Sequence, residues 1–156
     1  MTETPIEIRP ADLDDARIRA LLATHAERAL SNARCRVGHA LDLDALRVPQ
    51  IEVISLWRDG EPIAVGALRV LDASHGELKS MFVADAARGQ GIGVRLLDHL
   101  VDAARGRGMK RLSLETGTSA YFDAARRLYA GRGFERCEAF ADLPPHPDSV
   151  FLSRSI

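Results

Sequence analysis

The 156-residue sequence has only two cysteines, Cys35 and Cys137, which is too few for the disulfide framework of a small secreted domain. We expect both thiols to be reduced. The sequence also has no apolar run near the roughly 18 residues that a membrane-spanning helix needs. Its first ten residues include an acidic residue and no apolar stretch, so no signal peptide is expected. These absences predict a cytoplasmic protein that has no membrane partner.

An excess of charge of either sign is also missing. With 21 Lys and Arg against 22 Asp and Glu, the formal net charge is −1, so no strongly basic surface indicates a nucleic-acid partner. The five histidines are scattered without the spacing of metal ligands, and we therefore expect no metal. Any anion that this protein binds must be held by local geometry.

The residues that are present suit one domain over 1–156, because 46% of them are hydrophobic and can form a single core. Asp59-Gly60 predicts a tight hairpin turn, and the branched segments around it predict an antiparallel meander. The patterns predict an α/β (α+β) fold with about four helices and six to seven strands. The expected strands span 6–9, 51–57, 63–71, 77–83, 112–115, 134–140 and 150–153, and the expected helices include 18–25, 41–46, 94–104 and 121–131.

Three glycines stand at alternate positions in Arg88-Gly89-Gln90-Gly91-Ile92-Gly93, where a strand gives way to a helix. Glycine costs about 0.5–1 kcal/mol relative to alanine in regular structure, so some requirement must offset this cost. Two known phosphate-binding patterns do not fit. A dinucleotide fingerprint needs a third glycine where Val94 stands, and a P-loop needs Gly-Lys-Ser or Gly-Lys-Thr.

Two interpretations of this loop remain. One is a tight strand-to-helix connection that needs glycine for its own sake. The other is a pyrophosphate cradle, because the first turn of a helix offers unpaired N–H groups and a partial positive charge. Bare glycine backbone lets phosphate oxygens approach those donors closely.

The spacing Arg-x-x-Gly-x-Gly of Arg88, Gly91 and Gly93 resembles the coenzyme A signature of the GNAT superfamily of N-acetyltransferases. A second block is similar too: Tyr129 is followed by Gly133-Phe134, and Ala125 occupies the small position four residues before the tyrosine. The likeness is most specific between Glu77 and Phe134. The segments 39–46, 114–117 and 147–151 look similar to a bacterial subgroup labelled indole-3-acetate-acetyltransferase-like.

The resemblance implies a GNAT-type fold, with a mixed, mostly antiparallel sheet in which two central parallel strands splay apart. One departure from the family pattern is Phe122, where many members have an asparagine that contacts the pantetheine arm. We therefore expect backbone and apolar contacts to hold this arm.

The implied activity is acetyl transfer from acetyl-CoA, as co-substrate, to a primary amine of a small molecule by direct attack in a ternary complex. Few primary amines are unprotonated at neutral pH, so a base helps. Glu77 is the first candidate base, Glu115 the second and His75 the third. The alternative for Glu77 is an ordinary solvent-facing strand end, and the alternative for Glu115 is a buried structural carboxylate. Tyr129 matches the family's proton donor to the leaving thiolate.

The resemblance also implies which residues bind the ligands. Backbone N–H groups near Met81 and Phe82 would polarise the thioester carbonyl. The expected CoA-binding residues are Met81, Phe82, Val83, Arg88, Gly89, Gln90, Gly91, Ile92, Gly93 and Val94. Arg126, Arg127 and Arg132 could reach the 3′-phosphate or form a solvated helix face. The acceptor pocket is expected to involve Arg36, His39, Asp42 and Tyr121.

Other classes of protein fit the same sequence. One is a noncatalytic module that binds an acyl-CoA as a sensor, and another is an acetyltransferase acting on protein lysines or an N-terminus. The resemblance also makes a homodimer possible.

Overall fold

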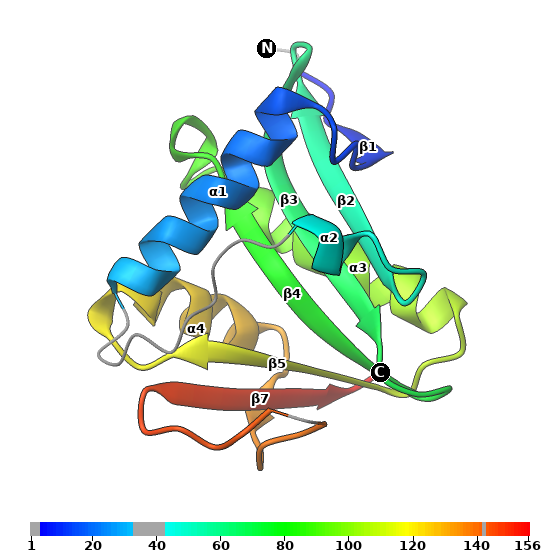
Figure 1. Cartoon of the computed structure of the whole chain (residues 1–156), viewed down its shortest axis with the longest axis vertical. Helices are drawn as coiled ribbons and strands as arrows, with labels where there is room; N and C mark the ends of the chain where they lie inside the picture. The colour runs from blue at the N-terminus through cyan, green and yellow to red at the C-terminus, as the bar shows by residue number, and fades with distance from the viewer. Residues whose placement is uncertain (1–3, 33–42, 142) are drawn as a thin grey trace.

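The computed structural model describes residues 4–32, 43–141 and 143–156. Helices and strands are interspersed along the chain, which ends in two β-strands (Figure 1). The elements are β1 (Glu7–Pro10), α1 (Ala16–Ser31), α2 (Leu43–Leu46), β2 (Ile51–Arg58), β3 (Glu61–Val70), β4 (His75–Val83), η1 (Asp85–Ala87), α3 (Ile92–Gly106), β5 (Arg111–Gly117), η2 (Ala120–Phe122), α4 (Asp123–Gly131), β6 (Glu135–Arg136) and β7 (Ser149–Ser155).

The described strands form one sheet of seven, in the order β1-β2-β3-β4-β5-β7-β6. Strands β1 to β4 pair antiparallel with their sequence neighbours, which confirms the expected meander. The turn between β2 and β3 has positive φ at both Asp59 (54°) and Gly60 (76°), the conformation that lets a two-residue loop follow the twist of its strands. Of the strand pairs in the described residues, β4 and β5 alone are parallel. This arrangement is the GNAT-type fold class that the sequence predicts.

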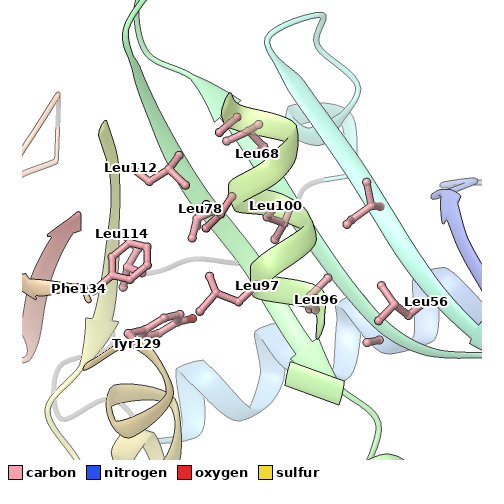
Figure 2. Close-up of a cluster of buried hydrophobic side chains, with 14 of the residues drawn as sticks. Leu56, Leu68, Leu78, Leu96, Leu97, Leu100, Leu112, Leu114, Tyr129 and Phe134 are labelled. Atoms are coloured by element: carbon pink, nitrogen blue, oxygen red, sulfur yellow. The ribbon is translucent and has the colours of Figure 1, made fainter. Parts of the chain in front are cut away.

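The sheet lies between two layers of helices. Helices α1 and α2 cover one face, and α3 and α4 cover the other (Figure 1). Ile18 and Leu22 of α1 belong to a buried cluster with Val65 and Phe82 of the sheet. The larger cluster on the α3 side includes Leu56, Leu68, Leu78, Leu96, Leu97, Leu100, Leu112, Leu114, Tyr129 and Phe134 (Figure 2). The alternation of side chains along each strand divides the core in this way.

The expected strand over 134–140 is much shorter than predicted. Glu135 and Arg136 pair with β7, the N–H of Cys137 donates one more hydrogen bond to the carbonyl of Phe151 at 3.0 Å, and the chain then leaves the sheet edge. The ring of Phe140 turns back onto the sheet, with its centroid 5.7 Å from that of Phe151 and 5.8 Å from that of His75. Burial of an aromatic ring therefore outweighs further pairing at the edge.

The sequence led us to expect reduced cysteines and no membrane-spanning helix. Cys137 is an exposed free thiol, and Cys35 lies outside the described residues. Among the residues that the structure describes, no helix has the length and apolar character needed to cross a membrane.

Candidate functional site

The two parallel strands separate soon after they meet. His75 to Glu77 of β4 align with Arg111 to Ser113 of β5, and no later residue of β4 pairs with β5 in the described structure. Figure 1 shows the two strands converging near the C-terminus and diverging toward the end of α1 and toward α4. The predicted splay is therefore present, and it leaves one edge of β4 without a neighbouring strand.

A β-bulge lies in β4 beside this opening. Lys79 pairs with Ala67 and Phe82 with Val65, so Ser80 and Met81 together stand opposite Gly66. Ser80 has a φ of 54°, which is uncommon for a residue other than glycine. After the bulge, Phe82 joins the cluster on the α1 face, whereas Met81 packs against the cluster on the α3 face. Bulges often re-aim side chains next to active sites, and the extra residue here exchanges the faces that Met81 and Phe82 would occupy in a regular strand.

Tyr129 of α4 lies on the α3 face, at one end of the core cluster (Figure 2). Its hydroxyl lies 3.7 Å from the sulfur of Met81, and its ring packs against Phe134 with the centroids 5.9 Å apart. Burial raises the pKa of Tyr129 to about 12. The phenol is therefore protonated at neutral pH. Among the described residues, its hydroxyl contacts the thioether of Met81, which is a weak acceptor.

Glu77 lies on the opposite face. Its buried carboxylate is 3.3 Å from Nη1 of Arg69 and 3.9 Å from Nζ of Lys79. Arg69 pairs with Glu77 across the antiparallel β3–β4 ladder, so both side chains share this face. A buried carboxylate needs such partners, because an uncompensated buried charge is costly. Glu77 is thus held in place at the last aligned pair of β4 and β5.

The other two candidate bases have different surroundings. Glu115 is half-buried on β5, two residues beyond Ser113 and opposite Phe151 of β7. His75 lies at the closed end of the opening, where its Nε2 is 2.6 Å from the hydroxyl of Ser113. Partial burial lowers the pKa of His75, and nearby Arg111 adds to this shift while Asp72 opposes it. Of the three candidate bases, Glu77 and Glu115 therefore lie nearer than His75 to the place where β4 and β5 part.

The three glycines of the loop before α3 have different structural roles. Gly89 and Gly91 have φ of 74° and 76°, and Gly91 is the N-cap of α3. No atom lies within 4 Å of where a Cβ would stand at either residue, so both face open space. Gly93 instead allows close packing, because a Cβ there would come within 3.3 Å of Leu128 on α4. Helix α3 thus begins at an exposed, left-handed turn whose first N–H groups have no intrahelical acceptor.

The side chains around these glycines are engaged elsewhere. Gln90 accepts a hydrogen bond from Arg58 at 2.6 Å and donates one to the carbonyl of Ala86, and Ile92 is buried. The side chains of Gln90 and Ile92 are thus taken up by contacts within the protein. Val83 and Val94 are half-buried beside the loop.

Arg88 lies with its guanidinium on the α1 side. Its Nε is 3.3 Å from Asp85 and 3.3 Å from the carbonyl oxygen of Val83, and its guanidinium carbon is 5.5 Å from the centre of the Phe82 ring. Arg28 from α1 makes a bidentate ion pair with the same Asp85, at 2.8 and 2.7 Å. Hydrogen bonding from Arg28 lowers the pKa of Asp85.

Sequence reasoning missed Arg28 and Asp85. Two signals were available: Asp85 is three residues before Arg88, and Arg28 follows His25 by three residues, one turn further along the same helix face. The contact between α1 and η1 depends on tertiary structure, and no local pattern indicates it.

Of the four residues expected to line the acceptor pocket, Tyr121 lies among the described residues. Tyr121 is half-buried in η2, with its ring edge-on to Phe122 at 4.9 Å. Arg36, His39 and Asp42 lie outside the described residues. Arg126 donates to the carbonyls of Gly117 and Ser119 and pairs with Asp123, so it holds the loop before α4 together.

The other two arginines named for the 3′-phosphate differ from Arg126. Arg127 is exposed, and Arg132 pairs with Asp98 of α3 at 3.3 Å.

Phe122 also has a clear packing role. A Cβ at Gly117 would lie 2.3 Å from the Phe122 ring, so the ring packs directly on the backbone at the end of β5.

The open strand pair, the bulge and the glycine turn before α3 define an acyltransferase fold. Residues 19–134 match the acetyltransferase (GNAT) family. The chain belongs to this family and is an acyltransferase.

Its relatives are similar along most of their length. An uncharacterized N-acetyltransferase, YsnE, of Bacillus subtilis (strain 168) is 38% identical over 97% of this chain and 100% of its own. YedL of Escherichia coli (strain K12), also an uncharacterized N-acetyltransferase, is 40% identical over 96% of this chain and 94% of its own. An IAA acetyltransferase of Azospirillum brasilense is 38% identical over 76% of this chain and 77% of its own.

Solved structures share the fold. A putative acyl-CoA N-acyltransferase from Klebsiella pneumoniae superposes with a TM-score of 0.78 at 28% identity, covering 96% of this chain and 97% of that one. A GNAT family acetyltransferase from Elizabethkingia anophelis with acetyl-CoA bound gives a TM-score of 0.73 at 21% identity, covering 97% and 98%.

Proposed function

We propose that this protein transfers the acetyl group of acetyl-CoA to a primary amine of a small molecule, by direct attack of the amine in a ternary complex. The observation that carries the proposal is the protonated Tyr129 hydroxyl beside Met81, at the edge of β4 that no strand covers. A phenol with only a sulfur acceptor is available to a ligand that occupies the strand opening.

The chain's own groups fit coenzyme A. The turn at Gly89 and Gly91 is open where side chains would otherwise stand, and the first N–H groups of α3 suit a pyrophosphate. The uncovered edge of β4 suits an extended pantetheine arm. Acetyl-CoA would supply an activated thioester in this opening.

The proposed proton transfers use the two faces of the sheet. Glu77 or, as the second candidate, Glu115 accepts a proton from the ammonium form of the acceptor on the α1 face, directly or through water. The free amine then forms the new C–N bond as the C–S bond breaks, with N–H groups near Met81 and Phe82 stabilising the developing oxyanion. As the amide forms, its nitrogen gives a second proton to solvent water. Tyr129 donates its proton to the departing thiolate and regains one from solvent, and the carboxylate releases the proton that it took from the ammonium to solvent, so that one proton is released overall.

Thiol release tests this proposal. The purified protein is incubated with acetyl-CoA and a panel of primary amines, and free CoA is detected with a thiol reagent. We expect amine-dependent release together with mass-spectrometric detection of the acetylated amine. Tight binding of acetyl-CoA without release for any amine would instead support the sensor alternative, and the activity proposed here would then be wrong.

A further inference from the structure

The ring of Phe82 is surrounded by three basic side chains. The guanidinium carbons of Arg28 and Arg88 lie 5.6 and 5.5 Å from its centroid, and the imidazole of His25 lies 5.6 Å from it. These residues come from α1 and from the loop before α3, so tertiary structure brings them together. Cations on an aromatic face are attracted to it, and Phe82 therefore helps to fix both guanidiniums.

Carboxylates act on both arginines of this Phe82 cluster. Asp85 forms ion pairs with Arg28 and with Arg88, and the charge of Glu27 adds a smaller effect on Arg28. Burial lowers the pKa of His25, which is therefore neutral at pH 7. Within the described residues, Arg88 thus shares its carboxylate partner with Arg28.

Donors of Arg88 remain open to a ligand. The Asp85 and Val83 contacts of Arg88 involve its Nε, and none of the described residues forms a hydrogen bond or ion pair with its two Nη groups. The side chain is about half exposed, at 49%. A planar guanidinium edge with two such N–H donors fits a carboxylate bidentately.

The cluster is close to the proposed reaction. The N–H groups near Met81 and Phe82 are those proposed to polarise the thioester carbonyl, and the Phe82 side chain faces α1. Glu77 also lies on this face, so the acceptor amine is proposed to approach from there. Tyr121 of η2 is near enough to Arg28 to add to the upward shift of the Arg28 pKa, after the larger effect of Asp85.

We infer that the acceptor is a small amino carboxylate, such as an α-amino acid, whose carboxylate binds Arg88 with Arg28 beside it while its amine faces the thioester. This inference rests on the proposed acetyl transfer. Arg28 has two roles in it: its ion pair positions Asp85, and its charge adds to the attraction for the acceptor. Arg88 contacts the carboxylate directly.

Matched acceptors test the inference. Each amino acid is compared with its carboxamide, which has the same side chain and amine but no negative charge. The amine of the carboxamide is the weaker base, so a larger share of it is unprotonated at neutral pH, and intrinsic chemistry favours the carboxamide. A preference for the acid must therefore come from the protein. We expect kcat/KM to be about 10- to 100-fold higher for the acid, as hydrogen bonds to a charged group allow.

Substitutions show which residues cause the preference for the amino acid over its carboxamide. In Arg88→Gln, with both acceptors measured at saturating acetyl-CoA, we expect the acid-to-amide ratio to fall about tenfold or more. Arg28→Gln should lower the ratio by a smaller factor, and Arg28→Lys should partly restore it. Arg19→Gln is the control, because Arg19 is an exposed arginine on the same helix and lies outside the cluster. Thermal unfolding verifies that each variant is folded.

The outcomes separate the two proposals. Equal activity on acids and carboxamides would overturn the carboxylate inference while leaving acetyl transfer intact, whereas no thiol release from any amine would remove both. A raised KM for acetyl-CoA in Arg88→Gln with an unchanged acid-to-amide ratio would assign Arg88 to the diphosphate of the cofactor, and would also overturn the inference.

Discussion

The two faces of the sheet differ sharply beside the opening between β4 and β5. On the α3 face, Tyr129 lies among leucines and Phe134 (Figure 2). Its hydroxyl contacts the sulfur of Met81. On the α1 face, Glu77 lies within ion-pair distance of Arg69 and Lys79. A dry environment keeps a phenol protonated, whereas a buried carboxylate needs cationic partners. The two faces thus suit the proposed acid and the proposed base.

The bulge in β4 makes this difference possible. An uninterrupted strand would keep its strict alternation of sides, whereas the extra residue at Ser80 and Met81 shifts the alternation by one. Met81 then contacts Tyr129 on one face and Phe82 contacts α1 on the other. The position where the strand changes register is also where the proposed carbonyl site lies.

The largest effect is expected when the proposed acid, the Tyr129 hydroxyl, is removed. In Tyr129→Phe we expect kcat to fall by about 1,000-fold, because general acid catalysis contributes roughly 10²–10⁴-fold. The affinity for acetyl-CoA and the stability should change little, since the hydroxyl gives up only a weak contact to sulfur. Thiol release and calorimetric titration measure the two quantities. An unaltered kcat in Tyr129→Phe would show that the apolar face supplies no proton.

A second test removes the proposed base, the Glu77 carboxylate. We expect Glu77→Gln to lower kcat/KM about 100-fold at neutral pH. The loss should shrink as the pH rises toward the pKa of the acceptor amine, because the amine then loses its proton without help. Rate profiles from pH 6 to 10 measure this, with Glu115→Gln in parallel. If Glu115→Gln shows the larger, pH-dependent loss, the base belongs to β5 rather than β4.

A third test concerns the loop that both faces share. Gly91→Ala places a Cβ on a residue with a φ of 76°, which costs roughly 1–2 kcal/mol, and fills space that we assign to the pyrophosphate. We expect about tenfold weaker binding of CoA by calorimetric titration. Gly106→Ala, at the end of the same helix and without a positive φ, should leave binding unchanged. Equal affinity in both variants would contradict the cradle.

The smallest expected effect concerns pH and stability. Burial lowers the pKa of His25 below its usual 6.5. Between that folded value and 6.5 the unfolded chain binds more protons, so stability rises with pH. The contribution is complete above pH 6.5 and is lost as the pH falls through the folded value.

We expect the free energy of unfolding to decrease by at most about 1.4 kcal/mol per pH unit for this histidine below pH 6.5. His25→Gln should flatten the profile measured by urea unfolding between pH 7 and 5, compared with His99→Gln on α3. A slope that His25→Gln leaves unchanged would show that another group carries the dependence.

Local sequence signals predicted the glycine loop, the hairpin at Asp59 and the amphipathic helices, because each depends on residues close together in the chain. The family pattern added the opening and Tyr129. The early end of β6 was missed because Phe140 packs on Phe151 and His75, which are distant in sequence. The ion pair of Arg28 with Asp85 was missed for the same reason, since 57 positions separate the two residues.

By itself, the sequence determined where the chain turns and which faces are apolar, since backbone freedom at glycine and hydrophobic periodicity are local properties. Only the tertiary structure decided which charges meet at Phe82 and which face each titratable group occupies. Those environments depend on how strands and helices pack. The one extra residue in β4 moves each later side chain of that strand to the opposite face of the sheet.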